Sequence, residues 1–274
     1  MPKTTTGHVN LNDGKLYYEV GGEGETLVLN HAGFVDSGMW DSQWDDLTRH
    51  YHVIRFDMRG YGKSDDVSAP IVRREDLHRL LQLLNVERAH LLGCSMGGEI
   101  VVDFALEHPE MVSSLILVST VPGGFEMQGA PPQNLLDMME AVKEGNLERA
   151  SELQIRIWVD GDYRKPEQVD PAVRQRAAEM NRIAVANGTW TKADMQPASP
   201  LDPPAAKRLN EIQCPTLIIV GALDNPEILR AADVMASEIP NAQKVIISDA
   251  AHVPNMDKSA EFNQAVLSFL QGIS

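Results

Sequence analysis

The sequence predicts an α/β fold in which a doubly wound, mostly parallel sheet of eight strands carries helices on both faces. Three observations support this fold class. Short aliphatic runs without polar alternation recur along the chain, as expected of strands that are buried on both faces. Stretches with helical spacing separate these runs. The chain has 274 residues, which suits one large domain or a core with an inserted unit.

The chain is expected to begin with antiparallel β structure. Residues 8–12 and 15–22 alternate between apolar and polar side chains, and Asp13-Gly14 between them is the residue pair typical of a tight hairpin. The runs that predict buried parallel strands are 26–32, 52–58, 89–95, 112–120, 215–224 and 243–252. We therefore expect one sheet whose first strands are antiparallel and whose remaining strands are parallel.

Helical spacing predicts the connections between these strands. Residues 75–86 and 99–110 place apolar side chains at the intervals of an amphipathic helix, and Pro109 ends the second of them. A last amphipathic helix is expected over 260–271. Because helices alternate with buried strands, the sheet is expected to have helical cover on both of its faces.

A long segment without a clear strand separates the strand that ends near Thr120 from the strand that begins near Pro215. It is longer than a normal crossover connection, so we expect an inserted unit. Helical spacing appears over 132–144, 147–159 and 170–188, with proline- and glycine-rich breaks between these stretches. The predicted division is a core formed by 1–120 and 212–274, with 121–211 as a helical lid.

The charge balance excludes one class of partner. The chain has 24 basic and 39 acidic residues and a net charge of −15, so it would repel the phosphate backbone of a nucleic acid. The sequence begins without the apolar core of a signal peptide, and no later run approaches the roughly 18 apolar residues of a membrane span. We expect a cytoplasmic protein with no membrane partner.

The two cysteines, Cys94 and Cys214, lie in apolar, strand-like surroundings and lack the spacing of a zinc or redox motif. They are expected to be reduced, buried thiols. Neither is a first candidate for chemistry, although Cys94 is adjacent to the motif described next. We expect no metal and no organic cofactor.

The stretch Gly93-Cys94-Ser95-Met96-Gly97 matches the pattern Gly-x-Ser-x-Gly. An aliphatic run precedes it and a helical stretch follows it, which is the strand-turn-helix context that this motif requires. A nucleophilic serine needs such a sharp turn, because the glycines relieve crowding while the hydroxyl stands clear of the sheet. The following helix would offer the free N–H of Met96 to an oxyanion. The competing interpretation is a purely structural turn.

A serine nucleophile needs a base, and on this kind of sheet the expected chain order is serine, acid, histidine. Six of the eight histidines precede Ser95, and His108 lies near the far end of the helix that follows the motif. His252 is therefore the candidate base, in a loop after the last predicted strand.

The acid should also follow a strand, and Asp224 does so in the stretch IIVGALDNPE. A carboxylate there would hold the histidine in one tautomer and stabilise its protonated form. Two rivals remain. Asp249 precedes His252 by three residues and is better explained as a turn residue, and Glu126 follows the strand that ends near Thr120.

The second oxyanion donor is expected in the loop HAGFVDSGMW, after the third predicted strand. Gly33 is the first candidate, because a glycine lets the backbone approach a substrate carbonyl closely. Phe34 is the alternative donor and otherwise a pocket wall. His31 is expected to anchor this loop by hydrogen bonding. Trp158 in the inserted segment is the second residue expected to contact substrate.

Taken together, these motifs resemble those of the α/β-hydrolase superfamily, and the resemblance covers nearly the whole chain. It includes HAGF, FDMRGYGKSD over 56–65, the GALD turn and the AAHVPNMD loop. Within the superfamily the sequence is similar to the small lidded esterases and enol-lactonases, with the haloperoxidase or perhydrolase group close by. The usual His-Gly pair is replaced by His31-Ala32, which leaves the donor open between Gly33 and Phe34.

The expected activity is hydrolysis of a carboxylic ester or lactone of a small to medium apolar substrate, through an acyl-enzyme on Ser95. Methionine and tryptophan residues of the predicted lid suggest the apolar substrate group. Three alternatives keep the same residues: a hydrolase that cleaves a carbon–carbon bond, a perhydrolase, or a ligand receptor. The partner is then a small molecule, and the chain is expected to be a monomer or a homodimer.

Overall fold

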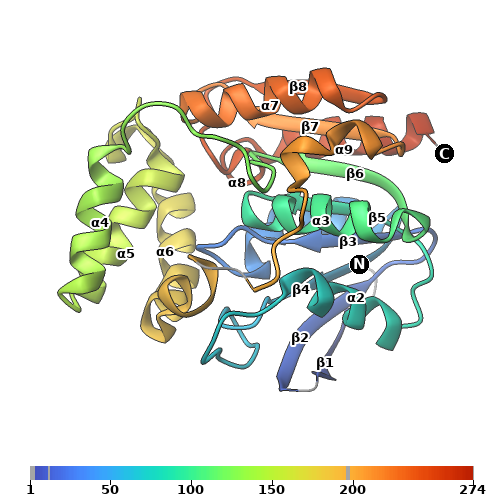
Figure 1. Ribbon diagram of the computed structural model, residues 1–274, viewed down its shortest axis with the longest axis horizontal. Helices are drawn as coiled ribbons and strands as arrows, with labels where there is room; N and C mark the ends of the chain where they lie inside the picture. Colours follow the sequence, from blue (N-terminus) through green and yellow to red (C-terminus); the bar gives the residue numbers. More distant parts are fainter. Residues whose placement is uncertain (1–3, 12, 196–197, 274) are drawn as a thin grey trace.

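The computed structural model describes residues 4–11, 13–195 and 198–273. Its centre is one sheet of eight strands in the order β1-β2-β4-β3-β5-β6-β7-β8 (Figure 1). The strands are β1 (Thr5–Leu11), β2 (Gly14–Gly21), β3 (Thr26–Asn30), β4 (His52–Phe56), β5 (Ala89–Cys94), β6 (Val112–Val118), β7 (Thr216–Gly221) and β8 (Ala242–Ile247). β2 is antiparallel to both of its neighbours, and all the other pairs are parallel. The predicted fold class is confirmed.

The first two strands form the predicted hairpin, but Gly14, predicted as a turn residue with Asp13, belongs to β2. Leu11 pairs with Gly14, and the antiparallel ladder extends to Thr5 and Val20. Residue 12, the last of the predicted first strand, lies outside the described residues.

The last two strands end earlier than the aliphatic pattern predicts. Prediction extended them to 224 and 252, whereas β7 ends at Gly221 and β8 ends at Ile247. Beyond these points the backbone turns: the N–H of Leu223 donates to Ala250 O and the N–H of Asp224 donates to Gly221 O. The residues that were counted as strand therefore form two facing loops at one edge of the sheet.

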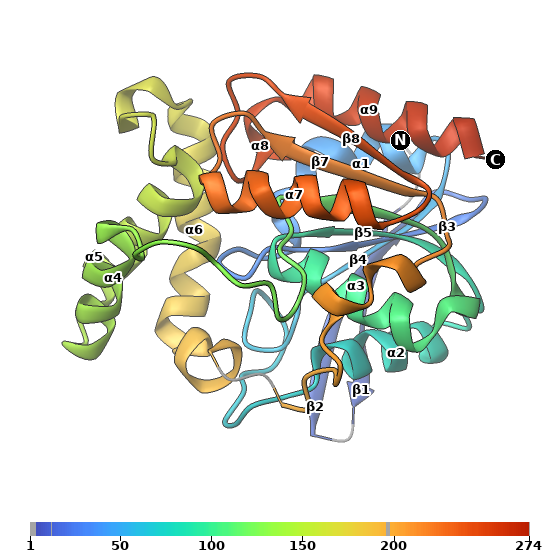
Figure 2. The same cartoon turned by 45° about the horizontal axis from the view of Figure 1, so that its top comes forward.

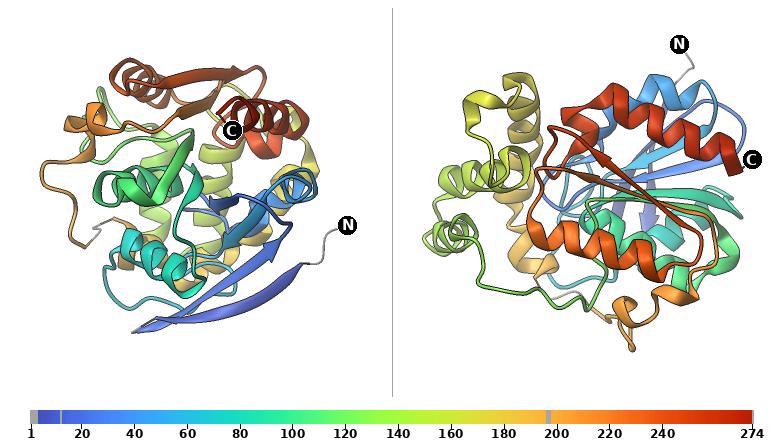
Figure 3. Two further views of the ribbon diagram at one scale, coloured as in Figure 1. Left: turned by 90° about the vertical axis from the view of Figure 1, so that its right-hand side faces the viewer. Right: turned by 90° about the horizontal axis from the view of Figure 1, so that it is seen from above.

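Helices cover both faces of the sheet, as Figures 2 and 3 show for α7 and α9. One face carries α2 (Arg73–Leu83), α3 (Met96–Glu107) and α7 (Pro226–Glu238), whose leucine, valine and isoleucine side chains pack on alternate residues of the strands. The opposite face carries α1 (Asp41–Thr48) and α9 (Ser259–Ile273). The short helix α8 (Pro254–Asp257) precedes α9. Two apolar layers result, one on each face of the sheet.

The inserted segment is helical, and Figure 1 shows its helices together at one end of the molecule. They are α4 (Gln133–Lys143), α5 (Leu147–Ile155) with the π-helical turn η3 (Arg156–Asp160), and α6 (Pro171–Asn187) followed by the π-helical turn η5 (Trp190–Asp194). The remaining short 3₁₀ turns are η1 (Ser37–Trp40), η2 (Pro109–Met111), η4 (Pro166–Gln168), η6 (Ala205–Lys207) and η7 (Leu209–Glu211). The division into core and lid stays a prediction. None of the described helices combines the length and the apolar character needed to cross a bilayer.

Candidate active site

Ser95 occupies a strained turn between β5 and α3. Its backbone angles are φ 53° and ψ −118°, a conformation that residues with a side chain rarely adopt. Its N–H donates to Val118 O of β6 at 2.8 Å, which fixes the turn against the neighbouring strand. A Cβ at Gly93 would lie 2.3 Å from Gly97 O, and one at Gly97 would lie 2.5 Å from Asn30 O. The glycines of the motif are therefore required by close backbone contacts.

His252 and Asp224 form a buried pair in the two loops that follow β7 and β8. The Nδ1 of His252 lies 3.0 Å from Asp224 Oδ2 and 3.2 Å from Oδ1. The two residues are 2% and 3% exposed, so water does not compete for this contact. With the proton on Nδ1, the lone pair on Nε2 is free to accept a proton.

The two rival acids lie elsewhere. Asp249 is exposed and sits in a turn with φ 52°, and Glu126 is also exposed.

Among the described residues, His252 Nε2 is buried without a hydrogen-bond partner, so Ser95 Oγ is not hydrogen bonded to it in this structure. Such contacts often form only when a substrate is bound.

A cavity of about 270 Å³ brings the predicted residues together. Its walls include Ser95 and His252 from two strand ends, with Gly33 and Met96 beside them. The other residues that line it are Phe34, Glu99, Ser119, Val121, Met127, Leu135, Met138, Gln154, Trp158, Trp190, Asp194 and Ile228. Residues of the inserted segment thus form much of one wall, and most of them are apolar.

The two aromatic residues expected to contact substrate both line this cavity. The ring of Trp158 lies 4.7 Å from that of His252, and the Phe34 ring lies 6.4 Å from that of Trp158. Trp158 lies in η3, where the helical spacing of 147–159 changes from α to π, and sequence periodicity does not reveal that change. Methionines of the inserted segment differ in position: Met138 is buried and lines the cavity, whereas Met139 is exposed.

The loop after β3 places backbone amides beside the first turn of α3. A Cβ at Gly33 would lie 3.0 to 3.3 Å from atoms of the Met96 side chain, so the two residues are in direct contact. No acceptor from the described part of the chain meets the amide N–H of Gly33, Phe34 or Met96. All three amides are therefore available to an oxyanion, and Gly33 and Phe34 both remain candidates for the second donor.

His31 anchors this loop, as expected. Its Nδ1 donates to Ala32 O at 2.8 Å, and its Nε2 accepts the N–H of Met58 at 2.9 Å. Burial lowers the pKa of His31 to about 4, so the ring is neutral at physiological pH. It has no free nitrogen for proton transfer.

Sequence reasoning missed a buried network on the other side of the same loop. The hydroxyl of Tyr61 lies 2.7 Å from Gly33 O and 2.5 Å from Asp194 Oδ2. Arg73 donates to Asp194 Oδ1 from Nη2 at 2.6 Å and from Nε at 3.0 Å. Tyr61 lies in the stretch RGYGKS that carried part of the resemblance, whereas Asp194 lies in η5, which no periodic pattern predicts.

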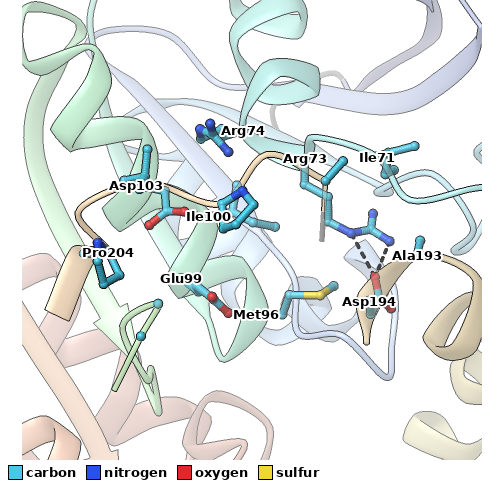
Figure 4. A pocket seen from close by; sticks show the side chains of 16 residues that line it. Ile71, Arg73, Arg74, Met96, Glu99, Ile100, Asp103, Ala193, Asp194 and Pro204 are labelled. Carbon is cyan, nitrogen blue, oxygen red and sulfur yellow. Dashed lines mark hydrogen bonds and ion pairs between the residues drawn. The ribbon is translucent and has the colours of Figure 1, made fainter. Parts of the chain in front are cut away.

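A second cavity of about 210 Å³ adjoins the first, and Figure 4 shows its side chains. The two cavities share Met96, Glu99 and Asp194. Burial raises the pKa of the Glu99 carboxyl to about 7, and the charges of Asp103 and Asp194 act in the same direction. Glu99 follows Ser95 by four residues on one face of a helix, and that spacing could have identified it.

Cys94 and Cys214 are both free thiols. Burial raises the pKa of Cys94 well above its usual value, and its Sγ lies 3.9 Å from His252 O. A buried thiol of this kind is not nucleophilic. In the described ranges, no group of three or more His, Cys, Asp or Glu side chains is arranged to hold a metal ion.

Comparison with known proteins is consistent with this geometry. A family model described as the alpha/beta hydrolase fold matches residues 25–259. The 2-hydroxy-6-oxo-6-phenylhexa-2,4-dienoate hydrolase of Comamonas testosteroni is 28% identical and aligns over 96% of this chain and 93% of its own. The pimeloyl-[acyl-carrier protein] methyl ester esterase of Yersinia enterocolitica is 29% identical, with 94% and 98% covered. The solved structure of Est816, an N-acyl homoserine lactone degrading enzyme, has a TM-score of 0.78 at 25% identity, with 96% and 100% covered.

Proposed function

Because this chain belongs to the α/β-hydrolase family, we propose that it hydrolyses a carboxylic ester or lactone of a small to medium apolar substrate through an acyl-enzyme on Ser95. One observation carries the proposal. His252, paired with Asp224, lines the cavity that also holds Ser95, and its Nε2 has no hydrogen-bond partner in the described part of the chain. A nucleophile, a base and an orienting acid are thus available at one site.

In the proposed mechanism, Ser95 Oγ attacks the substrate carbonyl carbon while His252 Nε2 takes the hydroxyl proton. The amide N–H of Met96 and that of Gly33 or Phe34 donate to the oxyanion. His252 then gives its proton to the leaving alcohol oxygen, and the acyl-enzyme forms. Water attacks that ester with His252 again as the base, and the acid is released. Asp224 keeps Nδ1 protonated throughout.

The predicted lid gives this site its substrate preference in our proposal. Met127, Leu135, Met138 and Trp158 come from the inserted segment and line the cavity with apolar surface. A cavity of about 270 Å³ suits a small or medium acyl or alcohol group. The esterase and lactonase among the similar proteins act on the same functional groups.

Hydrolysis of p-nitrophenyl esters from acetate to octanoate by wild type and by Ser95→Ala tests the proposal. We expect turnover with an optimum of acyl length in the wild type and its loss in Ser95→Ala. Ser237→Ala is the control, because Ser237 is an exposed serine whose hydroxyl donates only to Val234 O among the described residues. Equal turnover by wild type and Ser95→Ala would refute the role of Ser95.

A second candidate, cleavage of a carbon–carbon bond, is favoured by the similarity to the Comamonas testosteroni hydrolase. The same serine, histidine and aspartate would serve it. Product analysis with an ester, a lactone and a vinylogous diketone separates the two. Turnover of the diketone alone would replace the esterase proposal with this one.

A further inference from the structure

The second cavity begins where the first one ends, at Met96 and Glu99 of α3. Glu99 lines both cavities, and Figure 4 shows it between Met96 and Asp103. Glu99 follows Ser95 by four positions, a rise of about 6 Å along the helix axis. A substrate group that extends from the Ser95 site into the second cavity therefore has to pass the Glu99 carboxyl.

The charges that face Glu99 leave its carboxyl without a partner. Arg73, from α2, is paired with Asp194 at 2.6 Å, and Arg74, also from α2, is paired with Glu107 at 2.6 Å. Among the described residues, neither a hydrogen-bond donor nor a cation pairs with Glu99. Oδ1 of Asp103, one turn further along α3, is a buried atom without a hydrogen-bond partner among the described residues.

The position of His252 indicates which part of an ester enters this second cavity. His252 lines the first cavity and is absent from the lining of the second. Because His252 has to reach the leaving oxygen, the alcohol portion lies on its side of Ser95. In this arrangement the acyl portion would extend the other way, past Met96 and Glu99 towards the second cavity.

We propose that Glu99 is a specificity-determining residue, and that the second cavity accepts an ammonium group at the end of an otherwise apolar acyl chain. This inference rests on the proposed hydrolase function. Glu99 is half-buried and its carboxylate has no partner among the described residues, so it is only partly solvated, and a substrate cation beside it supplies the missing counter-charge. Acyl chains that end in a carboxylate would meet like charge at the same point.

The preference for a cation should depend on pH. With the pKa of Glu99 near 7, its carboxyl is neutral in acid and charged above neutrality. Asp103, Asp194, Arg73, Arg74 and the proposed base His252 are the other charged or titratable groups at the two cavities. The ratio of kcat/KM for a cationic and a neutral ester cancels any effect of pH on the base itself. A change in this ratio with pH therefore reports recognition of the cation.

The test compares ethyl 4-(trimethylammonio)butanoate with its neutral isostere ethyl 5,5-dimethylhexanoate, with acid release followed by pH-stat. In the wild type we expect kcat/KM for the cationic ester to exceed that for the neutral one by about tenfold at about pH 8.5. The ratio should fall towards one at about pH 6. Glu99→Gln should abolish both the preference and its pH dependence.

Glu110→Gln is the matched control, because it removes one exposed negative charge just beyond α3 and outside both cavities. The Glu110→Gln variant should keep the preference for the cationic ester. A ratio of one in the wild type at about pH 8.5, or an equal loss in Glu110→Gln and Glu99→Gln, would overturn the inference while leaving the esterase intact.

Equilibrium binding separates this inference from the proposed chemistry. Calorimetric titration of Ser95→Ala with the same two esters needs no turnover. Tighter binding of the cationic ester, lost in Ser95→Ala/Glu99→Gln, supports the role of Glu99 even if neither ester is hydrolysed by the wild type. Equal binding of the two esters contradicts it.

Discussion

Asp224 orients the imidazole ring of His252, the proposed base. It accepts the Nδ1 proton of His252, and its Oδ1 also accepts the N–H of Asn225 at 2.8 Å. The carboxylate is thus held from its own loop while it orients the ring. If the amide of asparagine replaced it, the NH₂ group could donate to Nδ1 and place the imidazole proton on Nε2, where it would block the base.

Asp224→Asn should therefore lower kcat for ester hydrolysis by about 10⁴ while the protein stays folded. Steady-state kinetics with circular dichroism measures both. Asp249→Asn is the control, since Asp249 is the exposed rival acid. A large loss of activity in Asp249→Asn with little loss in Asp224→Asn would reverse the assignment.

Single residues were predictable to different degrees. Ser95 was found because its motif requires glycines at close backbone contacts, and His252 because chain order left one histidine. The donor in the loop after β3 was not resolved, because the choice between Gly33 and Phe34 depends on the direction of peptide groups. Glu99 was missed, since a glutamate on a helix is usually a solvated residue and its burial depends on the inserted segment.

At the level of elements, the Tyr61 hydroxyl connects the segment between β6 and β7 to the loop after β3 through hydrogen-bond contacts. The side chains of Arg73 and Asp194 are 8% and 6% exposed, so this ion pair is shielded from water. The single hydroxyl proton of Tyr61 faces two acceptors, Gly33 O and Asp194 Oδ2. The position of the Gly33 peptide group thus depends on η5, which is far away in the sequence.

Tyr61→Phe should lower kcat by about tenfold and change KM little, because a displaced oxyanion donor weakens binding of the transition state more than that of the substrate. Steady-state kinetics across the p-nitrophenyl ester series checks this. Tyr163→Phe serves as the control, since Tyr163 is 59% exposed. A pure increase in KM would instead mean that Tyr61 acts on substrate binding.

Elements with strong periodicity were predictable, and irregular ones were not. Alternation located β1 and β2, and the aliphatic runs located the other strands of the described sheet. These runs overestimated β7 and β8 most, because loop residues such as Ala250 and Ala251 are also apolar and buried. The π-helical turns η3 and η5 have no pattern of their own. Their residues Trp158 and Asp194 had to be located by the structure.

For the whole molecule, buried carboxyls make stability depend on pH. Burial raises the pKa of Glu99 from 4.5 to about 7, and it raises those of Asp36 and Asp103 to about 6. A carboxyl whose pKa is higher in the folded state contributes its full stability below pH 4.5. That contribution is lost as the pH rises through about 7.

Glu99→Gln should thus match the wild type in free energy of unfolding at about pH 4.5, and exceed it by about 3 kcal/mol at about pH 8.5. Urea unfolding at both pH values measures the difference. His31 has a lowered pKa and loses its contribution as the pH falls below 6.5, but it affects both proteins alike. A difference in free energy of unfolding between the two proteins that stays constant across the pH range would contradict the raised pKa of Glu99.

At the scale of the whole molecule, the family resemblance drawn from motifs is confirmed over most of the chain, because the matched region runs from residue 25 to residue 259. The fold class follows from buried aliphatic runs that alternate with helical stretches, and it needs no side-chain detail. The shape of the cavities does need it, since their walls combine residues that the chain separates widely. Sequence therefore predicts the fold and the reacting groups better than it predicts the substrate.

The residues of the proposed triad come from distant parts of the chain, with His252 placed 157 residues after Ser95. During synthesis the ribosome produces the serine turn long before the acid and the base exist. If the proposed mechanism holds, the nascent chain then contains the serine without the acid and the base that would activate it. Turnover would begin only when β7 and β8 have docked at the edge of the sheet, so the first turnover would report a finished fold.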